Sequence, residues 1–260
     1  IQTVDGEVVV NEYSTGLDEV PTEWGGYGFT KDVTGIYEMN IPNDNYTLVN
    51  KTGGHIHMEG NSYLKSKTTY AVKNEASGDI ILDSGLIYGI HNVAGNLYLK
   101  EGLKVENGVN SYAVDNENGA VLIVDGVDIT STNNGICNSC SSSGSLLIVN
   151  EGNITSNTTT IKNGGATSYH NTYGTTYIDG GDIKSLTGYV IDANHGAVNV
   201  KNVYIESENQ IVNITGGTLN MYGGTLKSTS SQVAKGDGGS FNMYNGEVIA
   251  TSSQYSAIVQ

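Results

Sequence analysis

Apolar residues alternate with other residues in short segments that recur along most of the chain. In nearly every segment the second and fourth residues after a glycine are apolar, as Leu97 and Leu99 are after Gly95. An alternation with a period of two predicts a strand with one buried face. The predicted inward pairs are Ile56 and Met58, Ile80 and Leu82, Leu97 and Leu99, Val121 and Ile123, Leu146 and Ile148, Thr176 and Ile178, Val198 and Val200, Leu219 and Met221, and Phe241 and Met243.

Each alternating segment opens a longer unit. A turn follows the first strand and leads to a second short strand. The turn usually contains glycine, which readily adopts the positive φ that a tight corner requires. The inward residues predicted for the second strand are Ile129, Ile154, Ile183, Ile205, Leu226 and Val248. The unit occurs nine times, beginning at Gly54, Gly78, Gly95, Gly119, Gly144, Gly174, Gly196, Gly217 and Gly239.

A third short strand ends at an asparagine, as in the segments that begin at Tyr88 (Tyr-Gly-Ile-His-Asn) and Tyr112 (Tyr-Ala-Val-Asp-Asn). Asparagine tolerates the left-handed conformation of a corner, and its amide can bond its counterpart one coil away. The sequence therefore predicts an asparagine ladder made of Asn74, Asn92, Asn116, Asn138 and Asn163.

Strands this short bury their apolar faces only when the coils stack, which predicts parallel pairing between successive units. We therefore expect an all-β, right-handed parallel β-helix with three strands per coil and about nine coils, one for each of the nine units. It would fill residues 53–260, after an N-terminal cap or irregular first coil in residues 1–52. The alternative is a β-sandwich, which requires antiparallel hairpins with two-residue turns. We also expect the C-terminal edge to continue into further repeats or to be covered by another chain, because an open coil exposes unpaired backbone.

Charge excludes several classes of partner. The chain has 27 acidic and 12 basic residues and a formal net charge of −15, and all 12 basic residues are lysine. Such a chain repels phosphate backbones and anionic headgroups, so neither nucleic acid nor direct membrane contact is expected.

The repeats and the asparagine corner in residues 54–260 resemble the pectate-lyase-like right-handed parallel β-helix superfamily. The segment Gly-Gly-Thr-Leu-Asn-Met-Tyr-Gly-Gly-Thr-Leu at 216–226 is similar to repeats of adhesin-like surface proteins of anaerobic gut microbes. The resemblance implies extracellular work on carbohydrate. However, the superfamily's lyases use a basic residue that is usually arginine, and this chain contains no arginine. The Asn-x-Asp, Asp-Asp, Gly-His-Gly and Arg-x-Lys motifs of its polygalacturonases are also missing from the sequence.

A candidate contact surface lies between the inward residues. The outward column is predicted to be His57, Ile81, Tyr98, Leu122, Leu147, Tyr177, Asn199, Asn220 and Asn242, of which five consecutive members are apolar or aromatic. A contiguous apolar strip indicates either a partner or a cover supplied by the insertion at 163–173 or by the N-terminal segment.

Tyr222 and Tyr244 are expected to stack beside Asn220 and Asn242. Aromatic rings pack on sugar C–H groups and amides bond sugar hydroxyls, so these four residues are candidates for ligand binding, together with Tyr98 and Tyr177. The alternative is a cross-coil stack that binds nothing.

Metal sites are the remaining candidates. His55, His57 and Glu59 share one outward strand face and could hold zinc or nickel, or could simply be solvated. Calcium could bind at Asp125 with Asp128 or at Asp179 with Asp182, although both pairs flank glycine turns that explain them without an ion. Asp115 and Asp192 share a corner but lie three coil steps apart, about 14 Å, which is too far for a catalytic pair.

Cys137 and Cys140 form a lone Cys-x-x-Cys segment. A disulfide in an oxidising compartment is favoured over two free thiols and over metal or redox chemistry, since neither additional ligands nor a strand–helix context surrounds them.

Together these features favour a non-catalytic extracellular adhesin or surface scaffold of microbial origin, secreted or attached to the cell wall. It would present a β-helix face to a host or microbial surface glycan or protein. The alternative is a carbohydrate-active enzyme of the β-helix superfamily, either a polysaccharide lyase or a glycoside hydrolase.

Overall fold

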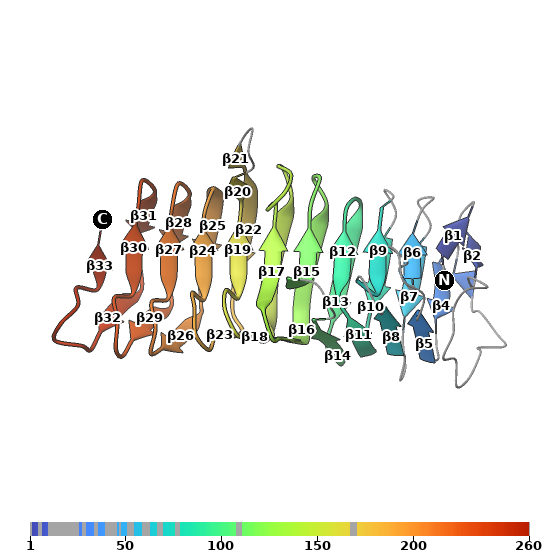
Figure 1. Ribbon diagram of the computed structural model, residues 1–260, viewed down its shortest axis with the longest axis horizontal. Coiled ribbons are helices and arrows are strands. Elements are labelled where there is room, and N and C mark those ends of the chain that lie inside the picture. Colours follow the sequence, from blue (N-terminus) through green and yellow to red (C-terminus); the bar gives the residue numbers. More distant parts are fainter. Residues whose placement is uncertain are drawn as a thin grey trace.

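The computed structural model describes a rod of stacked β-strand coils (Figure 1). The described residues are 2–4, 7–9, 26–27, 30–33, 36–39, 46, 48–50, 55–58, 63–66, 70–75, 79–107, 111–166 and 171–259. They form strands and turns, and they include no helix that is long and apolar enough to cross a membrane. Neighbouring coils pair in parallel along the rod, which confirms the parallel β-helix and excludes the sandwich.

Sheet A carries the third strand of each predicted unit. It has twelve strands in the order β2-β1-β6-β9-β12-β15-β17-β19-β24-β27-β30-β33. Their bounds are β1 Gln2–Val4, β2 Glu7–Val9, β6 Leu48–Asn50, β9 Val72–Asn74, β12 Ile90–Asn92, β15 Tyr112–Asn116, β17 Asn134–Asn138, β19 Ile161–Asn163, β24 Ile191–Ala193, β27 Val212–Ile214, β30 Ala234–Gly236 and β33 Ile258–Val259.

Sheet B carries the first strand of each predicted unit along the path β3-β4-β7-β10-β13-β16-β18-β22-β25-β28-β31. The bounds are β3 Gly26–Tyr27, β4 Thr30–Val33, β7 His55–Met58, β10 Asp79–Leu82, β13 Asn96–Lys100, β16 Val121–Ser131, β18 Leu146–Ser156, β22 Gly174–Ile178, β25 Gly196–Val200, β28 Thr218–Met221 and β31 Ser240–Met243.

The second strand of each unit forms the remaining side of the coil. Up to β23 these strands belong to sheet B, and β16 and β18 run around the corner to serve both sides. Beyond β23 they form sheet D. The bounds are β5 Ile36–Met39, β8 Tyr63–Ser66, β11 Gly85–Tyr88, β14 Leu103–Glu106, β23 Asp182–Ser185, and, in sheet D, β26 Tyr204–Ser207, β29 Thr225–Ser228 and β32 Glu247–Ala250.

The N-terminal end of the rod is closed by antiparallel pairs. Strand β1 pairs antiparallel with β2, and β3 pairs antiparallel with β4, so both sheets finish in a hairpin-like pair where a parallel coil would otherwise be open. Strands β4, β5 and β6, which fall within the predicted cap region 1–52, pair in parallel with β7, β8 and β9.

The core is a continuous stack of aliphatic side chains inside the coils. Most of the predicted inward residues are fully buried, including Ile80, Leu82, Leu97, Leu99, Val198, Val200 and Leu219. The inward residues of the second strands are buried from Ile129 to Leu226, and Val248 packs against this core. Met243 is 46% exposed, because β31 has a neighbouring strand on one side only.

The predicted inward residues of two coils are wrong by one position. Leu122, Val124, Leu147 and Val149 are fully buried, whereas Val121, Ile123, Leu146 and Ile148 are partly exposed. The pairing of Asn96 with Val121, and of Leu146 with Thr175, aligns Ala120 and Ser145 with the glycines of the neighbouring units. The turn in these two coils therefore contains one extra residue. As a result, Gly119 and Gly144 precede the position that is aligned with the other glycines by one residue. A shift of one residue turns every side chain of a strand to the other face.

The asparagine ladder is confirmed and extends one coil further than predicted, to Asn50. All six amides have no exposed surface, and each of the first five donates from Nδ2 to the Oδ1 of the next over 2.8 to 3.1 Å. Because a buried amide without a partner is costly, the ladder holds six successive coils in one register. Its members are Asn50, Asn74, Asn92, Asn116, Asn138 and Asn163.

Candidate functional site

The outward face of sheet B carries the candidate contact strip. The strand register places Ile81, Tyr98, Ile123, Ile148 and Tyr177 in one continuous column. The predicted members Leu122 and Leu147 are wrong, since they are buried and Ile123 and Ile148 occupy their places. The strip itself remains apolar, because the isoleucines that occupy these places are aliphatic like the predicted leucines. The predicted member His57 belongs to β7, whose side chains lie outside the described residues.

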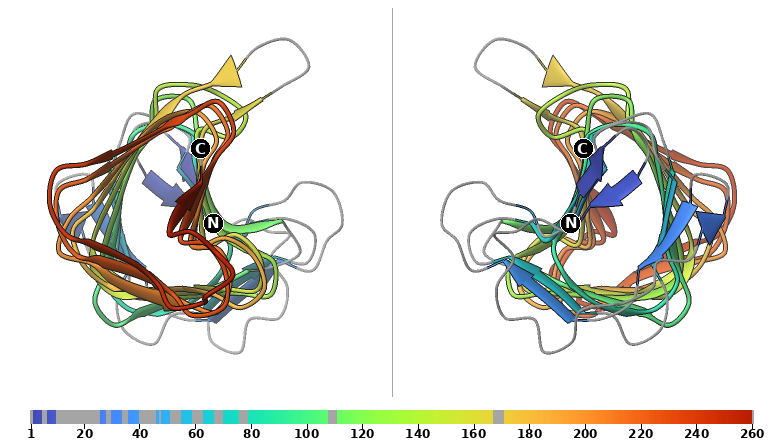
Figure 2. Two further views of the ribbon diagram at one scale, coloured as in Figure 1. Left: turned by 90° about the vertical axis from the view of Figure 1, so that its left-hand side faces the viewer. Right: turned by 90° about the vertical axis from the view of Figure 1, so that its right-hand side faces the viewer.

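The insertion does not cover this strip with any of its described residues. Strands β20 (Gly165–Ala166) and β21 (Asn171–Thr172) pair antiparallel as a small hairpin between sheets A and B. Seen along the rod, the hairpin projects away from the coils (Figure 2). Consistent with an open surface, Tyr177 is 48% exposed. Any cover from the N-terminal segment involves residues outside the described ranges.

The same column becomes polar in the C-terminal coils. Tyr177 is followed in register by Asn199, Asn220 and Asn242, which form a second amide ladder on the outside of the rod. Asn242 donates to Asn220 and Asn220 donates to Asn199, each over 3.0 Å. An amide has two N–H donors and two acceptor lone pairs, so Asn220 keeps one of each for a ligand.

Two tyrosines stack beside this outer ladder. The rings of Tyr222 and Tyr244 lie 4.9 Å apart with an interplanar angle of 6°, and they are 47% and 65% exposed. Each ring covers one face of its neighbour, so a sugar would meet the remaining face, the ring edges and the hydroxyls. Asn220, Asn242, Tyr222 and Tyr244 are called the tyrosine–asparagine surface below.

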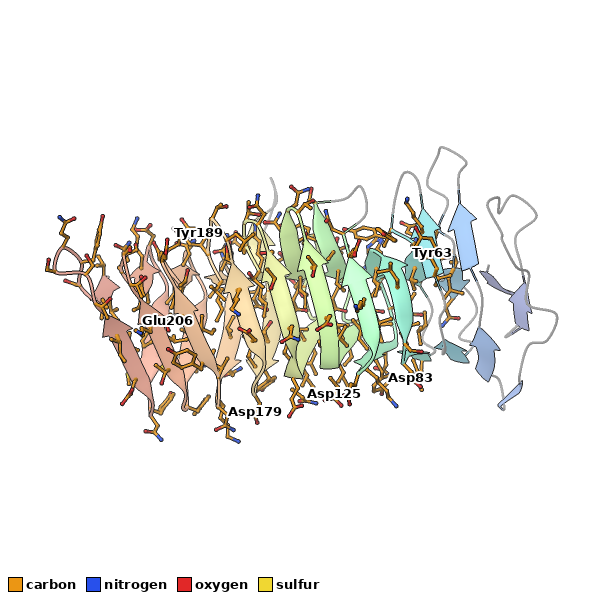
Figure 3. The ribbon with its side chains drawn as sticks, turned by 90° about the horizontal axis from the view of Figure 1, so that it is seen from below. Tyr63, Asp83, Asp125, Asp179, Tyr189 and Glu206 are labelled. Carbon is orange, nitrogen blue, oxygen red and sulfur yellow. A yellow bond between two sulfur atoms is a disulfide. The ribbon has the colours of Figure 1, made fainter. Side chains whose placement is uncertain are left out.

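The two predicted calcium pairs are engaged with other side chains. Asp128 accepts a hydrogen bond from Asn153 over 2.7 Å, and Asp182 forms an ion pair with Lys184. Asp179 accepts from Asn202 over 2.6 Å and lies 3.4 Å from the Lys201 amine. Figure 3 shows Asp83, Asp125 and Asp179 along one edge of the rod, as expected for residues of a repeated turn. Neither pair belongs to a cluster of three or more ligands within the described part of the chain.

A different cluster lies on the outward face of sheet A. The register of β9, β12 and β15 places Lys73, His91 and Asp115 side by side in successive coils. Asp115 and Glu117 flank the ladder residue Asn116, so strand alternation turns both carboxylates outward while the amide points inward. One ligand atom each from His91, Asp115 and Glu117 lies within 4.8 Å of the others. These three residues are called the sheet A cluster below.

Tyrosines surround the sheet A cluster. The Tyr70 hydroxyl donates to Asp115 Oδ2 over 3.4 Å, and the Tyr46 hydroxyl lies 3.4 Å from His91 Nδ1. The Tyr70 ring also packs against the His91 ring at 5.3 Å between centroids. His91 and Glu117 keep 19% and 13% of their side-chain surface exposed, so the cluster is largely shielded from water.

Shielding displaces the protonation equilibria of the cluster. Burial and repulsion from Glu117 raise the pKa of the Asp115 carboxyl to about 7. The adjacent His91 imidazole is the main cause that lowers the pKa of the Glu117 carboxyl, with help from the Ser141 hydroxyl. Burial, with the charge of Asp115 second, raises the pKa of Tyr70 above its ordinary value. Two neighbouring carboxyls are thus displaced in opposite directions, an arrangement that suits either ion binding or proton transfer.

The sequence pattern did not single out His91, and it suggested a pairing of Asp115 with Asp192 only. Asp115 and Asp192 do share one column, with Cys137 and Lys162 between them, and three coil steps separate them. The position directly before each ladder asparagine holds the signal that identifies the cluster. A comparison of this position between successive coils places His91 next to Asp115.

Two other predicted sites have different outcomes. Cys137 and Cys140 form a disulfide, and Cys137 is fully buried. Of the predicted metal ligands, Glu59 and the side chains of His55 and His57 lie outside the described residues, and only the backbone of the two histidines is placed, in β7.

Comparison with known proteins adds no relative. No family model, curated protein or solved structure matches the chain. Fold and site geometry therefore define the chain as a parallel β-solenoid repeat protein and leave its activity to be proposed from its surfaces.

Proposed function

We propose that the chain is a non-catalytic extracellular adhesin or surface scaffold of a microbe, and that it binds a host or microbial surface glycan through the tyrosine–asparagine surface. The observation that carries the proposal is the pairing of exposed, stacked tyrosines with an outer amide ladder that retains unused donors and acceptors. A polymer laid along the C-terminal coils would meet an asparagine at each coil step of about 4.8 Å from Asn199 to Asn242.

Two further features support an extracellular place, either secreted or attached to a cell wall. Disulfides such as Cys137–Cys140 persist in oxidising compartments. The resemblance of the repeats to the pectate-lyase-like superfamily, and especially to adhesin-like proteins of gut microbes, points to the same setting. The net charge of −15 favours neutral glycans or basic protein surfaces over acidic polysaccharides.

Glycan-array binding of the purified chain tests the proposal. The variants Tyr244→Ala and Asn242→Ala should each weaken binding about tenfold, a loss of about 1.4 kcal/mol. Tyr204→Ala is the matched control, because Tyr204 is 56% exposed on sheet D, away from the outer ladder. Absence of binding across the array, or equal loss in the control, would refute the glycan-binding role.

A carbohydrate-active enzyme is the second candidate, and the sheet A cluster is the observation that favours it. Asp115 and Glu117 bring two carboxylate oxygens within 4.8 Å, close to the separation of about 5 Å in retaining glycosidases. Reducing-end and unsaturated-uronate assays on a polysaccharide panel distinguish the candidates. Turnover that Asp115→Asn or Glu117→Gln abolishes would establish the enzyme and overturn the non-catalytic proposal.

A further inference from the structure

The sheet A cluster has a ligand set that neither glycan binding nor turn chemistry explains. It combines one imidazole with two carboxylates from two successive coils, all turned to the same outward face. Such mixed nitrogen and oxygen donors suit divalent first-row transition metals, whereas calcium takes oxygen ligands alone.

The free atoms of the cluster converge. His91 Nε2 and Asp115 Oδ1 are buried and have no hydrogen-bond partner, although buried polar atoms are rarely left unpaired. His91 Nε2 lies 3.7 Å from Glu117 Oε2, which is too long for a hydrogen bond. Two ligands of one tetrahedral zinc ion, at about 2.1 Å from the metal, lie roughly 3.4 Å apart. The spacing between His91 and Glu117 is close to this value, and the ligand atom of Asp115 lies within 4.8 Å of both.

Two of the three residues are each held in place by a tyrosine. Tyr46 contacts His91 Nδ1, so an Nδ1–H donated to the tyrosine oxygen would leave the Nε2 lone pair facing the carboxylates. Tyr70 binds Asp115 Oδ2 and leaves Oδ1 for a ligand. Outer partners of this kind orient metal ligands in known sites.

Charge points the same way. Two carboxylates at this distance repel one another, and no lysine of the described residues forms an ion pair with either of them. The nearest members of the same column, Lys73 and Cys137, are engaged with Glu75 and in the disulfide. A divalent cation would compensate both negative charges at once.

We propose that His91, Asp115 and Glu117 bind one divalent transition-metal ion, of which Zn²⁺ is the representative. The site links two coils on the outward face of sheet A, beside the ladder residues Asn92 and Asn116, and its metal would add a second cross-coil link there. The inference is independent of glycan binding, which is assigned to a different face of the rod.

Zinc titration of the chelator-treated full chain, in non-reducing buffer, tests the proposal by calorimetry. We expect one Zn²⁺ per chain, which a hundredfold excess of Ca²⁺ does not displace. His91→Gln and Asp115→Asn should weaken binding more than tenfold, because loss of even an outer partner costs about 10- to 100-fold. Tyr46→Phe should weaken it by about tenfold, and this mild variant serves if the ligand variants fail to fold.

The matched control is the double variant His55→Gln, His57→Gln, which removes the other predicted metal site and should leave the stoichiometry at one. X-ray absorption of the zinc complex should show nitrogen and oxygen ligands without sulfur. The proposal is overturned by an absence of zinc binding, by unchanged affinity in His91→Gln and Asp115→Asn, by loss of binding in the double variant, or by displacement with calcium.

Discussion

Replacing Asn116 with alanine tests how much the buried asparagine ladder contributes to the stability of the fold. The Asn116 amide has no exposed surface, accepts from Asn92 over 2.8 Å and donates to Asn138 over 2.9 Å. It also donates to the carbonyl oxygens of Ala120 and Leu146. The substitution removes all of these bonds from the interior of the rod.

The expected magnitude follows from which groups lose their partner. Asn138 Oδ1 loses the Asn116 donor, and one N–H of Asn92 Nδ2 loses its acceptor. The second Asn92 N–H keeps the Val121 carbonyl, and the Ala120 carbonyl keeps its bond from the Leu146 N–H. A buried group left unpaired costs about 1 to 3 kcal/mol, so two such groups predict a loss of roughly 2 to 6 kcal/mol.

Asn220→Ala is the matched control, because Asn220 makes the same amide-to-amide bonds at 3.0 Å on the outside of the rod. Water replaces those bonds, so we expect a loss of about 1 kcal/mol or less. Guanidinium denaturation followed by circular dichroism measures both midpoints. Similar shifts in the two variants would refute the argument that burial, rather than the ladder bond itself, makes the interior amides stabilising.

Two further predictions concern the pH dependence of folding stability and the cost of replacing turn glycines. Burial raises the pKa of Asp192, against a hydrogen bond from Asn213 and the charge of Lys162. The folded chain therefore holds this proton more tightly than the unfolded chain, so the stability from Asp192 is complete below its ordinary pKa of 3.8 and is lost as pH rises through the raised pKa. Asp192→Asn should flatten that decline in a series of denaturation midpoints against pH, and an unchanged profile would contradict the assignment. Gly152→Ala should destabilise more than Gly119→Ala in the same assay: both have positive φ, 133° and 77°, but a Cβ at Gly152 would lie 2.6 Å from the Val127 carbonyl oxygen, whereas a Cβ at Gly119 has nothing within 4 Å. Equal losses would show that backbone strain alone sets the cost.

The repeated local pattern was enough to predict the fold. Alternating apolar residues identify strands, and asparagines that recur after each third strand identify one corner, as in Asn92 and Asn116. Both signals recur along the chain because every coil must bury its own apolar side chains and must pair the buried polar groups at its own corner. Each repeat is therefore subject to the same constraint. The stack of Tyr222 on Tyr244 followed from the same comparison of coils, whereas the disulfide was predicted from the isolated Cys-x-x-Cys segment.

Tertiary structure decided the features that depend on exact register between coils. One extra turn residue at Ala120 and at Ser145 moved Ile123 and Ile148 to the outside, and local periodicity alone does not show how a turn absorbs such a residue. The sheet A cluster needed the stacking as well, since His91 and Asp115 meet only through pairing of β12 with β15, and Tyr46 reaches them from 45 residues away. The sequence specifies which face of a strand is buried, because burial of apolar side chains is required within each short segment. Which outward polar side chains lie next to one another depends instead on the length of each loop, since the loop sets the register in which the next coil pairs.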